Sequence, residues 1–347
     1  MNTLPVILLP LTLLMLAAPA LAQTQTTTLE AALARAAGLP SVQLAVQEQR
    51  DARTDLARVL ADPLSTRLDR LQAQQRADLA DARAARAPKT ARAQIASAYA
   101  STLSGEGNVP LATQAQALAE RALRVAQLRL NNGGGNAQSV RDAEDALEDA
   151  RKNLTVARAG LLLTRGALAD LVGPLGQLQA PTSLPPAPSA EVVAQVLRES
   201  PNLLQARQSV VLSEFRLGLT DPSYTARRDI EVARSAVETA RKTQIQVQIG
   251  ERQGAQGLFD ALTRASREQA QLRQAATTAS AKVQSDRRRL AGGLISPLDL
   301  QQSELGAGRA TAAAERARND YLSNYYGLLA GGGAATIPST AQTGGGS

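Results

Sequence analysis

Apolar residues recur along most of this chain at the three- and four-residue steps of an α-helix. In residues 143–171 the steps alternate between four and three, which is the 3.5-residue period of a left-handed coiled coil. The positions are Ala143, Leu147, Ala150, Leu154, Ala157, Leu161, Thr164, Leu168 and Leu171. A stripe of mostly small residues, from Ser303 to Tyr321, lets neighbouring helices approach closely. The pattern predicts an all-α protein of elongated antiparallel coiled-coil hairpins.

Turn and capping residues divide this pattern into the same series of four helices, twice. We expect the first series near residues 29–37, 42–61, 64–130 and 137–171, and the second near 190–199, 202–219, 223–291 and 297–329. The connections are too short for anything but antiparallel neighbours. At about 1.5 Å per residue, each long helix spans roughly 100 Å, far more than a compact domain.

Two Asp-Pro pairs precede the long helices. Asp62 and Asp221 are predicted to cap the free N–H groups, and Pro63 and Pro222 to occupy the first helical position, where a missing N–H costs nothing.

The final helices have equally clear starts. Asn136 is the expected cap of the first, and Ser296 of the second, where Asp299 lies at the third helical position and favours the positive end of the helix dipole.

The sequence also resembles itself at an offset of about 160 residues, which indicates a duplication. Matching landmarks are Leu39-Pro40 and Ser200-Pro201, the two Asp-Pro pairs, Arg129 to Gly133 and Arg289 to Gly293, and Leu171-Val172-Gly173 and Leu329-Ala330-Gly331. We therefore predict a first helical repeat over 23–173, a proline-rich linker over 174–189 and a second repeat over 190–331. The Gly-rich tail, 332–347, is predicted to be disordered.

One segment fits two structures. Thr243 to Gly250 alternates polar and apolar residues with period two, as a half-buried strand does, although it lies inside the second long helix. Its counterpart in the first repeat contains Pro88. A continuous helix with a kink and a short strand both remain open here.

The first residues of the chain predict export. Leu4 to Ala18 is nearly all apolar and is followed by Ala20-Leu21-Ala22, so residues 1–22 resemble a secretory signal peptide cleaved before Gln23. An uncleaved anchor is the alternative. No later stretch approaches the roughly 18 consecutive apolar residues of a membrane helix.

Composition narrows the possible functions. The chain has no Cys, His or Trp, so disulfides, thiolate or imidazole metal sites, a lipidated cysteine and the usual catalytic bases are excluded. We predict no enzyme activity, cofactor or metal. The net charge is +7, but Arg alternates with Asp, Glu and Gln, and aromatic residues are only 2%, which argues against nucleic acid. Arg287-Arg288-Arg289 is a local exception that suits either a helix C-terminus or an acidic partner.

The second glycine turn carries a family resemblance. Residues 289–300, R-L-A-G-G-L-I-S-P-L-D-L, and the Ala-rich helix ending at Tyr325-Tyr326-Gly327-Leu328-Leu329 resemble a hairpin tip of TolC-type outer-membrane efflux proteins. In the first repeat only Arg129, Gly133 and Val140 match well. The order of motifs, the duplication and the signal peptide strengthen the resemblance, which covers most of residues 28–329.

The resemblance implies a homotrimer whose hairpins form a hollow helical cylinder. Its tips would face a periplasmic adaptor protein that works with an inner-membrane transporter. By this implication Gly133, Gly293, Leu294, Ser296 and Asp299 lie at the adaptor contact or the pore entrance. From residue type alone, glycines and caps of this kind are also ordinary turn residues.

The chain departs from the family at the two Asp-Pro pairs, where the family inserts the hairpins of its outer-membrane β-barrel. The sequence has no alternating 9- to 11-residue strands there. We therefore expect a TolC-like helical barrel subunit without the β-barrel, in the periplasm or cell envelope and associated with the outer membrane. Its expected role is efflux or export; the alternative is a structural coiled-coil scaffold or spacer of the envelope.

Overall fold

The computed structural model describes residues 26–331, so the predicted signal peptide and tail lie outside the described residues. The described chain is almost entirely helical, which confirms the predicted fold class. Its elements are β1 (Thr26–Thr27), α1 (Leu29–Ala34), the 3₁₀-helix η1 (Arg35–Gly38), α2 (Pro40–Ala61), α3 (Arg67–Asn131), α4 (Ala137–Val172), β2 (Gln177–Leu178), α5 (Ala190–Arg198), α6 (Pro201–Gly218), α7 (Arg227–Ala291) and α8 (Pro297–Leu329).

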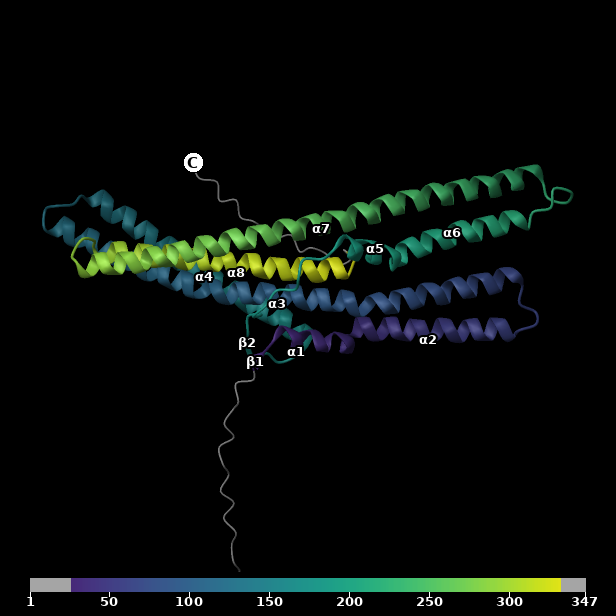
Figure 1. The fold of residues 1–347 in the computed structure, drawn as a ribbon, viewed down its shortest axis with the longest axis horizontal. Helices are drawn as coiled ribbons and strands as arrows, with labels where there is room; N and C mark the ends of the chain where they lie inside the picture. The colour runs from purple at the N-terminus through teal and green to yellow at the C-terminus, as the bar shows by residue number, and fades with distance from the viewer. Residues whose placement is uncertain (1–25, 332–347) are drawn as a thin grey trace, which may run out of the picture.

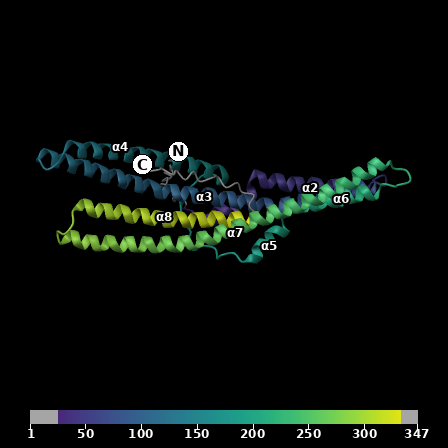
Figure 2. The ribbon, with the colours of Figure 1, turned by 90° about the horizontal axis from the view of Figure 1, so that it is seen from above.

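The helices form one long, twisted layer. In one half α4, α3, α8 and α7 lie side by side in that order (Figure 2), and in the other half the order is α2, α3, α6 and α7 (Figure 1). The two long helices, α3 and α7, run through both halves, and α1, α5 and the two strands lie near the middle (Figure 1). Each half is therefore built from two antiparallel hairpins.

The predicted coiled-coil seam of α4 is confirmed by burial. Leu147, Ala150, Leu154 and Leu168 are buried, and the remaining seam positions are half-buried. Next to the predicted seam of α8, Gly308 lets α3 come close, because an added Cβ would lie 2.8 Å from Leu111 Cδ2.

The long helices begin later than predicted. Asp62 is the C-cap of α2, and its carboxylate accepts a hydrogen bond from the Leu64 N–H (2.9 Å). The helix α3 instead starts after Thr66, whose hydroxyl and backbone N–H form a capping box with Asp69. A start at Pro63 would have left one residue to reverse the chain, which is shorter than a helical hairpin needs.

The connection between α6 and α7 differs from the prediction in the same way. The Asp221 carboxylate accepts from the Ser223 N–H (2.8 Å), Pro222 lies in the turn, and α7 begins at Arg227. Both aspartates thus stabilise turns, as Asp does when it competes for its own neighbouring N–H groups, and neither caps a long helix.

The ambiguous segment Thr243 to Gly250 is helical, so the strand alternative is wrong. The helix α7 continues through it, and α3 continues through Pro88. The burial has helical spacing: Gln244 and Val247 are half-buried, whereas Ile245 and Ile249 are exposed. The apparent alternation arises because apolar residues occupy two faces of one helix.

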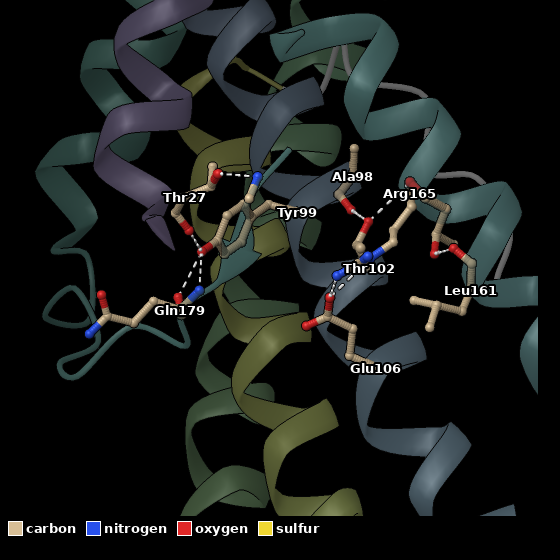
Figure 3. A network of polar contacts seen from close by, with 10 residues as sticks. Thr27, Ala98, Tyr99, Thr102, Glu106, Leu161, Arg165 and Gln179 are labelled. Carbon is tan, nitrogen blue, oxygen red and sulfur yellow. Dashed lines mark hydrogen bonds and ion pairs between the residues drawn. The ribbon is translucent and has the colours of Figure 1, made fainter. Parts of the chain in front are cut away.

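The prediction missed the small sheet in the middle of the molecule. Thr26 and Thr27 pair in parallel with Gln177 and Leu178, so part of the proline-rich linker is a strand. The Tyr99 hydroxyl lies 2.8 Å from the Thr27 carbonyl and 2.7 Å from the Gln179 carbonyl, and accepts from the Gln179 N–H (3.2 Å) (Figure 3). This side chain of α3 therefore fastens both strands to the long helix.

The same region joins α3 to α4. Thr102 donates to the Thr164 carbonyl (3.0 Å), and Arg165 forms an ion pair with Glu106 (2.5 Å) (Figure 3). Since Thr102 is fully buried, its second acceptor, the Ala98 carbonyl one turn earlier, keeps the hydroxyl satisfied when it is not bonded to α4.

Two apolar clusters flank this junction. The larger one combines α1, η1, the start of α2, α3, α4 and β2 with Leu322 of α8, and the smaller one centres on Leu262, Tyr321 and Leu328. Leu184, from the linker, packs against both clusters. No helix within residues 26–331 has both the length and the apolar character needed to cross a membrane.

Candidate functional site at the hairpin tips

The turns after α3 and α7 lie at the same end of the molecule (Figure 1), and they hold the residues singled out in the sequence. The first turn follows Asn131. Gly133 has φ 72°, its N–H donates to the Leu130 carbonyl (3.0 Å), and the Gly134 N–H donates to the Arg129 carbonyl (2.9 Å). This is a Schellman ending, which requires a left-handed residue and therefore favours glycine.

Gly135 has a different constraint. A Cβ placed there would lie 2.9 Å from the Leu130 backbone nitrogen, so the chain returns across the end of α3 at a distance that only glycine permits. Asn136 then begins α4, and its side-chain oxygen accepts from the Ser139 N–H (2.8 Å).

The second turn has the same backbone plan. Gly293 has φ 71°, its N–H donates to the Leu290 carbonyl (2.9 Å), and the Leu294 N–H donates to the Arg289 carbonyl (2.8 Å). A Cβ added to Gly133 or to Gly293 would meet no other atom within 4 Å, so φ alone favours glycine at both positions.

A capping box opens the last helix. The Ser296 hydroxyl accepts from the Asp299 N–H (3.2 Å), and the Ser296 N–H donates to the Asp299 carboxylate (2.9 Å). This N–H, with the Ser296 hydroxyl, holds the pKa of Asp299 below its ordinary value of 3.8. The cap is therefore complete when Asp299 is ionised.

The two tips present different side chains. Leu294 is 73% exposed, whereas the position 160 residues earlier is Gly134. The second tip therefore offers an apolar side chain at its apex, and the first offers backbone.

Behind the second tip lies a buried carboxylate that the sequence did not single out. Asp286 is 5% exposed, and it accepts from the Ser303 hydroxyl of α8 (2.5 Å) and from the Arg289 guanidinium (3.2 Å). The Ser303 bond, with a smaller effect of Arg289, holds the pKa of Asp286 below 3.8. Asp286 escaped notice because its principal partner lies on another helix.

Two arginines of the triplet at residues 287–289 form ion pairs within the chain. Arg287 pairs with Glu304 of α8 (2.9 Å), and Arg289 pairs with Asp286. Arg288 is exposed, and with Arg289 it lies in the last turn of α7, where cations oppose the negative end of the helix dipole.

A groove of about 520 Å³ runs between α3, α7 and α8 below the tips. Its lining is mixed and includes Gln114, Leu118, Val283, Arg287 and Gln301. The buried side-chain oxygen of Gln301 has no hydrogen-bond partner among the described residues. No group of three or more His, Cys, Asp or Glu residues in this part of the chain is placed to hold a metal ion.

The long edges of the layer carry exposed apolar side chains. On α4 these include Leu163, which is 76% exposed, and on α2 and α7 they include Leu44 and Ile245. The full set on these three helices is Leu44, Leu60, Val156, Leu162, Leu163, Val232, Ile245 and Ile249. Such residues at both edges of a layer favour lateral packing against further helices.

The fold is that of known channels. No protein-family model matches the chain, and no curated protein matches it. Among solved structures, the CmeC outer membrane channel of Campylobacter jejuni is similar with a TM-score of 0.65 at 10% identity, over 88% of this chain and 85% of that one. The MtrE outer membrane channel of Neisseria gonorrhoeae gives 0.54 at 16% identity, over 88% and 89%.

The chain has the helical fold of outer-membrane channels. The outer membrane protein VceC of Vibrio cholerae, with a TM-score of 0.58 at 16% identity over 87% of this chain and 94% of that one, extends the likeness. The resemblance to the TolC-type family is thus confirmed at the level of the fold. Within this fold, the second tip and the open edges both carry exposed apolar side chains.

Proposed function

We propose that this protein is a non-catalytic, TolC-like component of an efflux or export system, and that several copies form a helical tunnel. In this role it is exported, lies in the periplasm associated with the outer membrane, and works with a periplasmic adaptor and an inner-membrane transporter. The channel fold supports this role, as does the predicted signal peptide at residues 1–22.

The open edges of the helical layer carry the proposal. In one half α2 and α7 form the two edges, and Leu44 on α2 and Ile245 on α7 are both more than half exposed. Leu44 lies 17 residues before the end of α2, and Ile245 lies 18 residues after the start of α7. The two side chains are therefore at about the same height, and one subunit's α2 can pack on the next subunit's α7.

A ring of three subunits follows the family resemblance. A heterologous contact between two different edges generates a closed ring when its rotation closes, and each added subunit extends the same wall. The two halves of each subunit support this arrangement equally, since each contributes four helices across the layer. We propose that the subunit itself arose from tandem repeats at 23–173 and 190–331, joined by a linker at 174–189.

The adaptor-facing surface in this proposal comprises the two tips. Gly133, Gly293, Leu294, Ser296 and Asp299 are all exposed at one end of the molecule. Leu294 supplies the apolar contact, while the glycines leave backbone groups accessible to a partner helix.

Engineered cysteines test the ring directly, because the natural chain contains none. In one chain α3 and α6 separate α2 from α7, and three helix spacings of about 8–10 Å exceed the reach of a disulfide. The double variant L44C/I245C should therefore cross-link only between subunits, and oxidation should give a covalent ladder that ends at three.

The matched control is L44C/V232C, whose second cysteine lies on the same helix with similar exposure. Val232 is 13 residues from Ile245, or roughly 20 Å along the helix. Little cross-linking is expected. A monomeric rod with no ladder in either variant would reject the tunnel and favour a scaffold, and equal ladders in both would show unspecific association.

A further inference from the structure

A groove of about 460 Å³ lies between α6 and α7 where α5 ends, far from the tips. Three of its lining side chains are arginines, one from each helix: Arg198, Arg207 and Arg252. The others include Leu203, Gln244 and Gln248. Gln244, Gln248 and Arg252 follow one another at four-residue steps, so they form one stripe of α7 facing the groove.

Of the three guanidinium groups, Arg198 has a carboxyl near it, since after Lys89 and Gln195 it helps to lower the pKa of Glu199. None of them takes part in an ion pair among residues 26–331, although many other arginines there do. All three are exposed side chains that line a common cavity, where like charges repel one another. An anion in the groove would remove this repulsion.

The two carboxylates adjacent in sequence to Arg198 and Arg252 are bound to other side chains. Glu199 pairs with Lys89 and accepts from Gln195 (3.0 Å), and Glu251 accepts from Ser200 (2.8 Å) and Asn202 (2.7 Å). These bonds hold both acids beside α5 and the start of α6, and neither acid is part of the lining of the groove.

A second cavity, of about 310 Å³, extends the basic surface. It shares Arg198, Leu203 and Arg207 with the groove and adds Arg86, Lys89 and one carboxylate, Glu199. Arg86 already donates to the Gly331 carbonyl (2.7 Å), and Lys89 holds Glu199. The uncommitted positive charge is thus concentrated on Arg207 of the shared wall and on Arg252.

We propose that this groove, which we call the α6–α7 groove, binds a phosphate group. Guanidinium groups bind phosphate and carboxylate oxygens in pairs. A carboxylate has two coplanar oxygens, whereas a phosphate directs oxygens tetrahedrally and can meet donors from three separate helices. Gln244 and Gln248 supply further N–H donors. The phosphate can be a free ion or small phosphate ester, or the headgroup of an anionic lipid.

Calorimetric titration of the mature protein at constant ionic strength tests this site, with inorganic phosphate as the ligand and acetate as the carboxylate comparison. We expect saturable phosphate binding that weakens as salt is raised. Each Arg→Gln change at 207 or 252 should weaken it about tenfold, the loss of one charge-assisted hydrogen bond. R207K/R252K keeps the charge but not the paired geometry, so it should fall between wild type and R207Q/R252Q.

The control is R216Q, which removes the same charge from an exposed position of α6 outside the lining of the groove. It should bind phosphate as wild type does. Vesicles of phosphatidylglycerol in phosphatidylcholine form a second arm. Binding of these vesicles but not of free phosphate, lost in R207Q/R252Q, would assign the phosphate to a lipid.

Three results would overturn the proposal: no saturable binding in either arm, equal loss in R216Q and R207Q/R252Q, or tighter binding of acetate than of phosphate. Melting curves without ligand guard against misfolding. R207Q/R252Q should melt no lower than wild type, because it removes repulsion. The result does not depend on the tunnel, since the cysteine ladder can fail while the groove still binds phosphate.

Discussion

The two hairpin tips have the same backbone plan and different side chains. Both end a 65-residue helix with a left-handed glycine and the same pair of turn hydrogen bonds. The first tip then continues as Gly134-Gly135-Asn136, and the second as Leu294-Ile295-Ser296.

This difference separates what the turn requires from what a partner could use. The shared left-handed glycine is set by the reversal of the chain, so its presence says little about function. Leu294 is not needed by the turn, since Gly134 makes the same hydrogen bond, yet it is largely exposed. The second tip is therefore the better candidate for a partner contact.

Replacing the apolar apex should have the largest effect. We expect L294D to weaken binding of the proposed periplasmic adaptor about 30-fold, as for a central interface residue. G134D, its counterpart, should have little effect, because a Cβ at Gly134 makes only ordinary contact, 3.8 Å from the Arg129 carbonyl. Titration of purified adaptor against each variant measures this. Equal weakening by both would show that the tips are equivalent.

Adding one methyl group should distinguish the glycines of the first tip. We expect G135A to destabilise this tip by about 2 kcal/mol, since its Cβ collides with backbone. G133A should cost about 1 kcal/mol, from its positive φ alone. Amide hydrogen exchange of peptides spanning residues 125–140 reports this local stability. G134A is the control, and an exchange rate raised as much as in G135A would contradict the explanation.

Removing the helix caps should give a smaller difference between the tips. N136A and S296A should each cost about 1 kcal/mol, with S296A the larger because the Asp299 carboxylate also loses a partner. Exchange of the Ser139 and Asp299 amides measures the two losses. A larger effect of N136A would mean that the capping box adds nothing.

Lowering the pH should produce the smallest difference in local stability between the two tips. The folded-state pKa of Asp299 is lowered. Its contribution to the stability of the second tip is therefore complete above about pH 3.8 and is lost as the pH falls through the lower folded-state pKa. The pKa of Asp286 is lowered as well, so its contribution to stability is also lost as the pH falls. The amide cap of Asn136 does not titrate in this range. Exchange at pH 5 and pH 3, corrected for intrinsic rates, should show selective weakening of the second tip, reduced in D299N.

Most of the helical layout could be predicted because apolar spacing and turn chemistry agree along the chain. The ends of α4 and α8 follow directly from Asn136, Ser296 and the glycines. The predicted starts of α3 and α7 are wrong, because the carboxylates of Asp62 and Asp221 accept from the N–H two residues later and stabilise a turn. Thr66 and Asp69, three residues apart, were the available signal for α3.

Other features depend on neighbours that local patterns do not encode. Two-residue strands have too few positions to show a period, and their pairing relies on Tyr99, more than 70 residues away from either. Asp286 is buried only because Ser303 of the next helix faces it. The α6–α7 groove likewise needs three helices to bring its arginines together.

The contact of Leu322 with the larger apolar cluster has a consequence for the order of folding. The other buried residues of that cluster lie between residues 29 and 178, so the cluster stays incomplete until the last helix has been synthesised. Contacts of such high sequence separation close slowly. A chain that lacks its last helix would therefore leave the apolar surface that Leu322 covers exposed to water.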